Sequence, residues 1–134
     1  MILYKDGYRF QTCAEYQADT GIIPPTHIKT DWIELDIYGH LNLTKGYAWN
    51  GADFPAINDK TNIAASAEHD ALYQLIRLGL LPMSYKELAD RRLRLRMRKA
   101  GASVFRSTYY ELSVMLGGGH AVDPSAEKQV KVAP

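Results

Sequence analysis

The stretch that decides the fold is TNIAASAEHDALYQLIRLGL, residues 61–80, in which apolar residues recur with the 3.6-residue period of an α-helix. Thr61 or Asn62 can cap its start, and Gly79 stands near its end. EHDALY at residues 68–73 is the one place where a base, a carboxylate and a phenol fall together inside an otherwise apolar helical pattern. We therefore predict that residues 68–73 carry the functional site.

Helical geometry gives the polar residues of this stretch different directions. His69 and Tyr73 are four residues apart and share a face, whereas Asp70 is rotated by about 100° from His69. His69 and Asp70 can therefore serve different partners, as a general base and a metal ligand do.

Two β-hairpins are predicted before this helix. Residues 2–11 place short apolar and aromatic runs on either side of Asp6-Gly7, a dipeptide that tolerates the positive φ of a tight turn. Residues 32–37 and 41–44 alternate apolar and polar side chains around a second tight connection. The intervening residues 12–30, with two consecutive prolines, are expected to form a loop.

A second helix is predicted after the first. Ser84 and Glu87 fit a capping box, and Met83 and Leu88 occupy the two positions of a hydrophobic staple. The helix should therefore begin at Ser84, and it should end near Lys99, before a glycine.

The third helix completes an α+β fold with two N-terminal β-hairpins packed against a C-terminal three-helix unit. The predicted single domain, residues 1–116, consists of a β-rich part (1–45), a loop (46–60) and the helices (61–116), and residues 117–134 are expected to form a flexible tail. In the third helix, residues 102–116, five apolar side chains are expected to point inward: Val104, Phe105, Tyr109, Leu112 and Met115.

Composition excludes several classes of protein. The 134 residues carry a net charge of +1, which predicts no strong attraction of the whole molecule to nucleic acid or membranes. Cys13 is the only cysteine, so an internal disulfide or a thiolate metal cluster is excluded. The N-terminus lacks the apolar run of a signal peptide, and no apolar stretch is long enough to span a membrane, so we expect a cytoplasmic protein.

Asp90 is the predicted partner of His69. The short connection between the first two helices makes them antiparallel neighbours, and at about 1.5 Å per residue the two residues lie at comparable heights above the turn. Asp90 shares a helical face with Leu93 and Met97, and a carboxylate on an apolar face needs a partner. Paired with His69, it would fix the imidazole tautomer, as in a general-base arrangement. The alternative is an ion pair with a nearby arginine: Arg91, Arg92 or Arg94.

Residues 46–60 are expected to form an irregular loop that returns over the first helix. Gly51 precedes His69 by 18 residues, and exposed backbone groups there can bind a developing oxyanion or a hard cation. Asp70 is a candidate oxygen ligand for such a cation, and Ca²⁺ accepts a mixture of carboxylate and carbonyl oxygens. The alternative is that the glycines only form turns and that the aromatic residues of the loop belong to the core: Tyr47, Trp49 and Phe54.

His69-Asp70-x-x-Tyr73 on one helix, Asp90 on the next and a Gly-containing loop upstream resemble the catalytic core of the phospholipase A2 superfamily over about 45 residues. The resemblance implies that His69 is the base that activates water, with Asp90 and Tyr73 as its hydrogen-bonded support. It implies an oxyanion or substrate loop containing Tyr47, Trp49, Asn50 and Gly51. It implies a Ca²⁺ site formed by Asp70 and by the loop around Trp49, Gly51 and Asp53.

The chain departs from that family in two places. Glu68 and Leu72 stand where the secreted enzymes carry disulfide cysteines, and Asn50 and Asp53 interrupt the Gly-rich loop. These departures concern the metal site more than the pairing of His69.

A second resemblance covers most of residues 4–110. The order GYxWNGA at residues 46–52, then Pro55, HDALY at 69–73 and Ala89-Asp90 is similar to a family of small uncharacterised proteins encoded by tailed bacteriophages and prophages. It implies a viral protein that acts in the cytoplasm of the bacterial host during infection or is associated with the virion.

The arginines of residues 91–99 do not form one clean stripe, because steps of two residues advance by about 200° on a helix. A solvated helix surface is the expectation, and binding of phosphate or phospholipid head groups is the alternative. Nucleic-acid binding would require these arginines to be free of carboxylate partners.

Two hypotheses for function follow from these patterns. The first is a phage-encoded small hydrolase, a phospholipase A2-like lipid esterase that acts on a phospholipid or another ester through water activated by His69, with Ca²⁺ at Asp70. The second is a non-enzymatic virion protein, of the tail or of its assembly, that contacts other phage structural proteins. In that case the same residues only lock the loop onto the helices.

Overall fold

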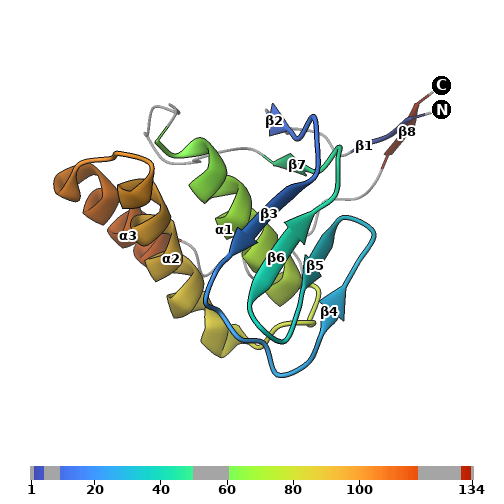
Figure 1. The fold of residues 1–134 in the computed structure, drawn as a ribbon, viewed down its shortest axis with the longest axis horizontal. Helices are drawn as coiled ribbons and strands as arrows, with labels where there is room; N and C mark the ends of the chain where they lie inside the picture. Colours follow the sequence, from blue (N-terminus) through green and yellow to red (C-terminus); the bar gives the residue numbers. More distant parts are fainter. Residues whose placement is uncertain (1, 5–9, 50–60, 118–130, 134) are drawn as a thin grey trace.

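The structure, a computed structural model, describes residues 2–4, 10–49, 61–117 and 131–133. The fold is α+β, as the sequence predicts, and within these described ranges seven strands precede three α-helices and one strand follows them (Figure 1). Among the described residues, no helix is both long and apolar enough to cross a bilayer.

The main sheet has four antiparallel strands in the order β3-β6-β5-β4. Their bounds are β3 Tyr16–Asp19, β4 Ile28–Lys29, β5 Ile33–Leu35 and β6 His40–Leu43. The predicted second hairpin is confirmed, because β5 pairs with β6 in the register Ile33 to Leu43. The loop prediction for residues 12–30 is wrong where β3 and β4 form. These short strands form because β3 pairs with β6 and β4 pairs with β5. Their own residues show little of the alternating pattern that predicts a strand.

Two smaller strand pairs flank this sheet. β1 (Ile2–Tyr4) pairs with β8 (Lys131–Ala133), and β2 (Phe10–Gln11) pairs with β7 (Ala48–Trp49). Both strands of the predicted first hairpin therefore exist, but each pairs with a strand distant in sequence, because short strands take their partners from tertiary contacts. Of the predicted tail, residues 131–133 form a strand and residues 118–130 lie outside the described residues.

The three predicted helices all form. They are α1 (Ile63–Arg77), α2 (Lys86–Lys99) and α3 (Val104–Gly117), and a 3₁₀ turn, η1 (Met83–Tyr85), precedes α2. The predicted capping box at Ser84 is wrong. Because the 3₁₀ turn begins at Met83, Tyr85 occupies the N-cap position of α2, and its side chain makes no cap hydrogen bond.

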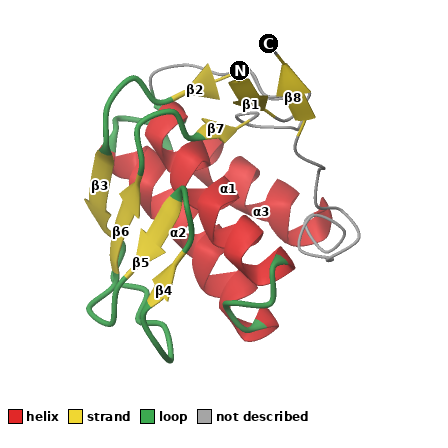
Figure 2. Ribbon diagram, turned by 90° about the vertical axis from the view of Figure 1, so that its right-hand side faces the viewer, coloured by secondary structure: helices red, strands yellow, loops and turns green. Residues whose placement is uncertain are grey.

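Helix α1 lies between the main sheet and the pair α2–α3 (Figures 1 and 2). Ten of its 15 residues are buried, so it packs on two sides. Towards the sheet, its side chains join a core cluster that includes Ile33, Leu35, Leu41, Leu43, Leu72 and Leu75. Towards the other helices, Ala65 packs in a second cluster with Leu93, Met97, Ala102, Tyr110 and Val114.

Helix α3 buries the face opposite to the one that the sequence predicts. Its buried residues are Ser107, Tyr110 and Val114. The side chains predicted to point inward are all exposed: Val104, Phe105, Tyr109, Leu112 and Met115. Polar contacts account for this rotation, because the buried Tyr110 hydroxyl accepts hydrogen bonds from Asn62 at 3.0 Å and Arg106 at 3.2 Å.

The turn between β5 and β6 provides a test of this packing. Gly39 has φ +84°, and an added Cβ would lie 3.1 Å from the backbone N and O of Ile22, whereas Gly79 has φ +74° and open space around it. Gly79→Ala should lower the free energy of unfolding by about 1–2 kcal/mol through φ strain alone. Gly39→Ala should cost clearly more in the same urea titration. Equal costs would contradict the close approach of the turn to Ile22.

Candidate functional site

His69 of α1 and Asp90 of α2 lie in direct contact, as predicted. The distance from His69 Nε2 to Asp90 Oδ1 is 2.7 Å, and the two residues are 6% and 1% exposed. The alternative, an arginine partner for Asp90, is wrong. The nearby arginines pair with other carboxylates: Arg91 with Glu87, Arg92 with Glu68 and Arg94 with Glu111.

Two further donors complete the surroundings of the Asp90 carboxylate. The Tyr73 hydroxyl donates to Oδ1 at 2.5 Å, and Lys86 Nζ donates to Oδ2 at 2.9 Å and to the carbonyl of Val114 at 3.3 Å. Sequence reasoning missed Lys86, although its spacing of four residues from Asp90 on α2 was a usable signal. We call His69, Tyr73, Lys86 and Asp90 the Asp90 cluster.

The charge states in the Asp90 cluster follow from these contacts. Burial by itself would raise the pKa of Asp90, but the hydrogen bonds from His69, Tyr73 and Lys86 outweigh it and hold the pKa below its usual value. Burial, the hydrogen bond to Asp90 and the negative charges of Asp90 and Asp70 raise the pKa of Tyr73 far above its usual value. At neutral pH, Asp90 is therefore a carboxylate and Tyr73 a neutral phenol.

The ionised Asp90 determines which nitrogen of His69 carries a proton in the neutral ring. A carboxylate can only accept hydrogen bonds, so Nε2 must be the protonated nitrogen and the lone pair lies on Nδ1. The described residues place no hydrogen-bond partner at Nδ1. In its neutral form, the ring therefore has its proton acceptor at Nδ1.

The loop residues before α1 are described only in part. Tyr47 and Trp49 are buried in the core cluster, and Trp49 Nε1 donates to Ser66 Oγ of α1 at 2.9 Å. For these two aromatic residues the alternative, a core position, is confirmed. Asn50, Gly51, Asp53 and Phe54 lie outside the described residues, so their roles in an oxyanion loop or a metal site stay predictions.

The metal site stays a prediction as well. Asp70 is half-buried on α1, and Trp49 is the only other proposed ligand among the described residues. In the described part of the chain, no three His, Cys, Asp or Glu side chains converge on a point where they could hold a metal. We therefore derive no catalytic step through a cation.

Glu68 is a second buried carboxylate that sequence reasoning did not identify. It is 1% exposed and accepts hydrogen bonds from Arg92 Nε at 3.0 Å and Tyr16 at 2.7 Å, with Arg96 Nε 3.2 Å away. Its position four residues before the buried Leu72, on an apolar face, was the available signal. Glu68 joins β3, α1 and α2.

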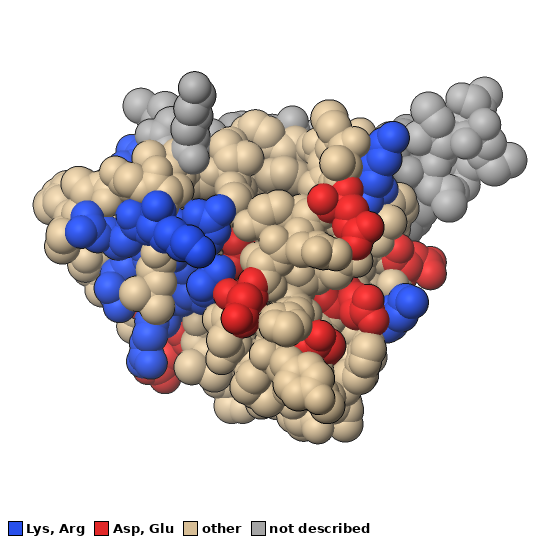
Figure 3. Space-filling model, viewed as in Figure 1, with Lys and Arg blue, Asp and Glu red and all other residues tan. Residues whose placement is uncertain are grey.

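The ion pairs of the arginines in residues 91–99 bear on the predicted alternatives for this segment. Figure 3 shows a gathering of basic side chains at the side of the molecule formed by α2 and α3. Within residues 91–99, however, only Arg98 and Lys99 lack a carboxylate partner among the described residues. This pairing does not meet the requirement for nucleic-acid binding.

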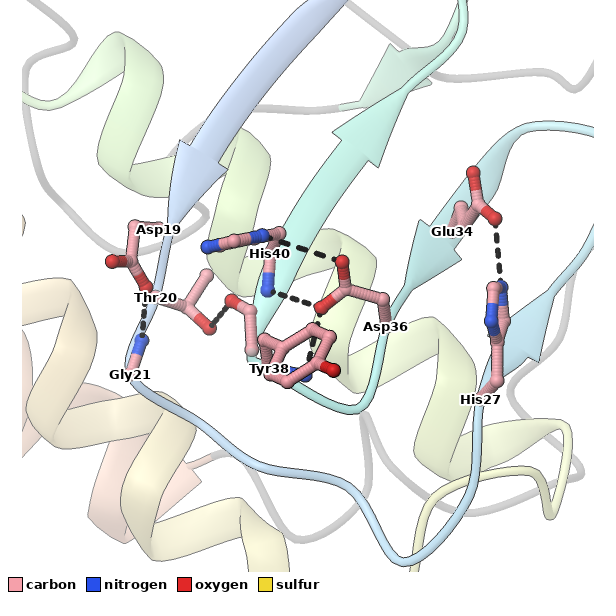
Figure 4. A network of polar contacts seen from close by, with 9 residues as sticks. Asp19, Thr20, Gly21, His27, Glu34, Asp36, Tyr38 and His40 are labelled. Atoms are coloured by element: carbon pink, nitrogen blue, oxygen red, sulfur yellow. Dashed lines mark hydrogen bonds and ion pairs between the residues drawn. The ribbon is translucent and has the colours of Figure 1, made fainter.

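A surface groove of about 570 Å³ lies on the main sheet, and no residue of the Asp90 cluster lines it. It contains two histidine–carboxylate pairs, His27 Nε2 to Glu34 at 2.7 Å and His40 Nδ1 to Asp36 at 3.3 Å (Figure 4). Both histidines are exposed, and their partners are already supplied within the sheet. The groove is therefore a weaker candidate than the Asp90 cluster.

Comparison of the chain with protein-family models, with characterised proteins and with solved structures gives no match. Both resemblances stay predictions, and the geometry of the Asp90 cluster is the evidence for function.

The pKa of Asp90 predicts how stability depends on pH. A carboxyl group whose pKa is lowered by folding stabilises the protein above its usual pKa of 3.8, and this contribution is lost as the pH falls through the lower folded value. Asp90→Asn should therefore lower the free energy of unfolding by about 3 kcal/mol near neutral pH, because it leaves Lys86 without its buried counter-ion. The deficit should shrink below about pH 4.

Urea titrations across this pH range test the prediction. Asp31→Asn, at an exposed carboxylate, is the matched control and should change stability little at any pH. A deficit for Asp90→Asn that stays constant down to the acid end of the range would show that Asp90 is not ionised in the folded protein.

Proposed function

We propose that this protein is a small hydrolase that cleaves carboxylic esters, and that its substrates are phospholipids, as in a phospholipase A2-like lipid esterase. The observation that supports the proposal is the hydrogen bond between His69 Nε2 and Asp90 Oδ1, which leaves the lone pair of Nδ1 for catalysis. A buried histidine with one nitrogen fixed by a carboxylate and the other without a described partner has the arrangement of a general base.

In the proposed reaction, a water molecule is bound at Nδ1 of His69. Nδ1 takes a proton from this water while the water oxygen forms a bond to the acyl carbon, and the Asp90 carboxylate stabilises the resulting imidazolium. The tetrahedral intermediate then collapses, the bond from carbon to the leaving oxygen breaks, and Nδ1 returns the proton to that oxygen. The products are a carboxylic acid and an alcohol.

The other members of the Asp90 cluster have supporting roles in this proposal. Tyr73 stays protonated because of its raised pKa, so it acts as a donor to Asp90 and not as a nucleophile. Lys86 balances the buried negative charge from the opposite oxygen of the carboxylate. The oxyanion donors are proposed to come from the backbone around Gly51, and a cation at Asp70 would add positive charge at the same place.

The alternative function is that of a non-enzymatic phage virion or assembly protein. The observation that favours it is the 6% exposure of His69, because a fully structural histidine would be as well covered. In this alternative the Asp90 cluster only holds α1 and α2 together, and Lys86 ties them to α3 through Val114. The two functions predict different effects of replacing His69: a hydrolase would lose activity, whereas a structural protein would have no activity to lose.

Ester hydrolysis by the purified full chain tests the proposal. With phospholipid and short-chain ester substrates, His69→Gln should lower kcat/KM by about 10²- to 10⁴-fold, the usual contribution of a general base. Tyr73→Phe should have a smaller effect, because His69 keeps its bond to Asp90. Tyr16→Phe, which removes the hydroxyl of a half-buried tyrosine from Glu68, is the control and should keep full activity if folded.

The wild-type chain decides between the two functions. Absence of any released fatty acid or other acid from folded wild-type protein would refute the hydrolase. Full activity in folded His69→Gln would refute the mechanism.

Calcium binding is predicted to appear as a change in thermal stability. A ligand at 100 times its Kd stabilises the folded state by about 2.7 kcal/mol, so Ca²⁺ should raise the Tm, and Asp70→Asn should abolish the rise. Mg²⁺ at the same concentration is the control, because it tolerates mixed, flexible coordination poorly. A Tm that is indifferent to Ca²⁺ would remove the cation from the proposal and leave His69 as the base.

A further inference from the structure

The outer face of α3 is apolar and exposed. Phe105, Tyr109, Leu112 and Leu116 follow the spacing i, i+4, i+7 and i+11, so they form a single stripe along the helix. Phe105 is 83% exposed and Leu116 is 89% exposed. Most helices of globular proteins bury such a stripe and expose the polar one, and an exposed apolar stripe of this size marks an interaction site.

The neighbouring face of α2 alternates apolar and basic residues. Leu88, Arg91, Leu95 and Arg98 stand at i, i+3, i+7 and i+10, and all four are exposed. Helices α2 and α3 pack against each other in antiparallel directions, as the pair Arg94–Glu111 and the contact of Lys86 with Val114 show. We call the exposed faces of α2 and α3 together the outer hairpin face.

The outer hairpin face carries basic side chains that no carboxylate neutralises among the described residues. Arg98 and Lys99 have no carboxylate partner among the described residues, and Arg91 lies 3.5 Å from the exposed Glu87. The apolar stripe of α3 contains no acidic residue, since Glu111 lies beside it and is paired with Arg94. Basic side chains gather at the side of the molecule formed by α2 and α3 (Figure 3).

We infer that the outer hairpin face is a docking surface for an anionic phospholipid bilayer. Large apolar side chains can enter the boundary between head groups and acyl chains, while arginine and lysine bind lipid phosphates. A second copy of the chain is a poorer occupant, because a symmetric contact would bring the two basic α2 faces together. Nucleic acid is poorer too, because the exposed aliphatic residues would gain nothing from its phosphates.

This surface is independent of catalysis by His69, although it would bring the proposed lipid esterase to its substrate. Lys86 contacts both Asp90 and the backbone of α3, so the Asp90 cluster and the outer hairpin face share one helix pair. Vesicle binding requires no turnover, so the docking surface and the hydrolase can fail separately.

Flotation of the full chain with lipid vesicles tests the inference. The protein should bind vesicles that contain phosphatidylglycerol, bind vesicles of phosphatidylcholine alone much more weakly, and lose affinity as salt is added. Phe105→Glu and Leu116→Glu should each weaken binding about tenfold or more, because the buried apolar contact is lost and a repelled charge is added. Arg91→Gln with Lys99→Gln should weaken binding to anionic vesicles only.

A matched control comes from the opposite side of the fold. Tyr38 is 68% exposed in the turn between β5 and β6, so Tyr38→Glu adds the same charge at an exposed aromatic residue and should leave vesicle binding unchanged. Each variant replaces an exposed side chain, so folding should be preserved, and circular dichroism checks it.

Three outcomes would overturn the inference. They are no binding to anionic vesicles, binding that Phe105→Glu and Leu116→Glu do not change, and an equal loss of binding in Tyr38→Glu. Sedimentation equilibrium in the same buffer identifies the competing occupant. A dimer that Phe105→Glu dissociates, without vesicle binding, would assign the outer hairpin face to a second copy of the chain.

Discussion

The packing of α1 against α2 depends on a buried negative charge, the carboxylate of Asp90. A carboxylate that is 1% exposed is very unfavourable unless donors surround it, and three donors reach it here. His69 and Tyr73 come from α1, whereas Lys86 comes from the preceding turn of α2. Because His69 and Tyr73 of α1 must both reach the same carboxylate of α2, their hydrogen bonds fix the position of α1 along α2. Lys86 extends the constraint to α3 through the carbonyl of Val114.

Glu68 is also a buried carboxylate surrounded by donors, but its donors are of a different kind from those of Asp90. Its partners are two arginines and the hydroxyl of Tyr16, all of which are fixed donors at neutral pH. Such a group can tie the sheet to the helices but has no means of moving a proton. Asp90 differs because one of its partners is an imidazole with a second nitrogen. Of the two carboxylates that are buried among the described residues, Asp90 is therefore the one that supports a proposal of catalysis.

The helical parts of the fold and the central contact could be predicted because their signals are local. The 3.6-residue period identified α1, and the short connection to α2 placed His69 beside Asp90. Partners distant in sequence left no such signal, which is why the pairing of β1 with β8 and the contact of Tyr16 with Glu68 were missed. The orientation of α3 was wrong because the apolar stripe suggested the buried face, whereas hydrogen bonds to Tyr110 decide it.

The central claim is that Asp90 holds the neutral ring of His69 with its proton on Nε2 and its lone pair on Nδ1. Nitrogen-15 NMR of the folded protein, recorded above the pH at which the ring loses its second proton, distinguishes the two tautomers directly. We expect a protonated Nε2 and an unprotonated Nδ1 for His69. A proton on Nδ1 of His69 would contradict the account, because the nitrogen proposed as the base would then have no lone pair to accept one.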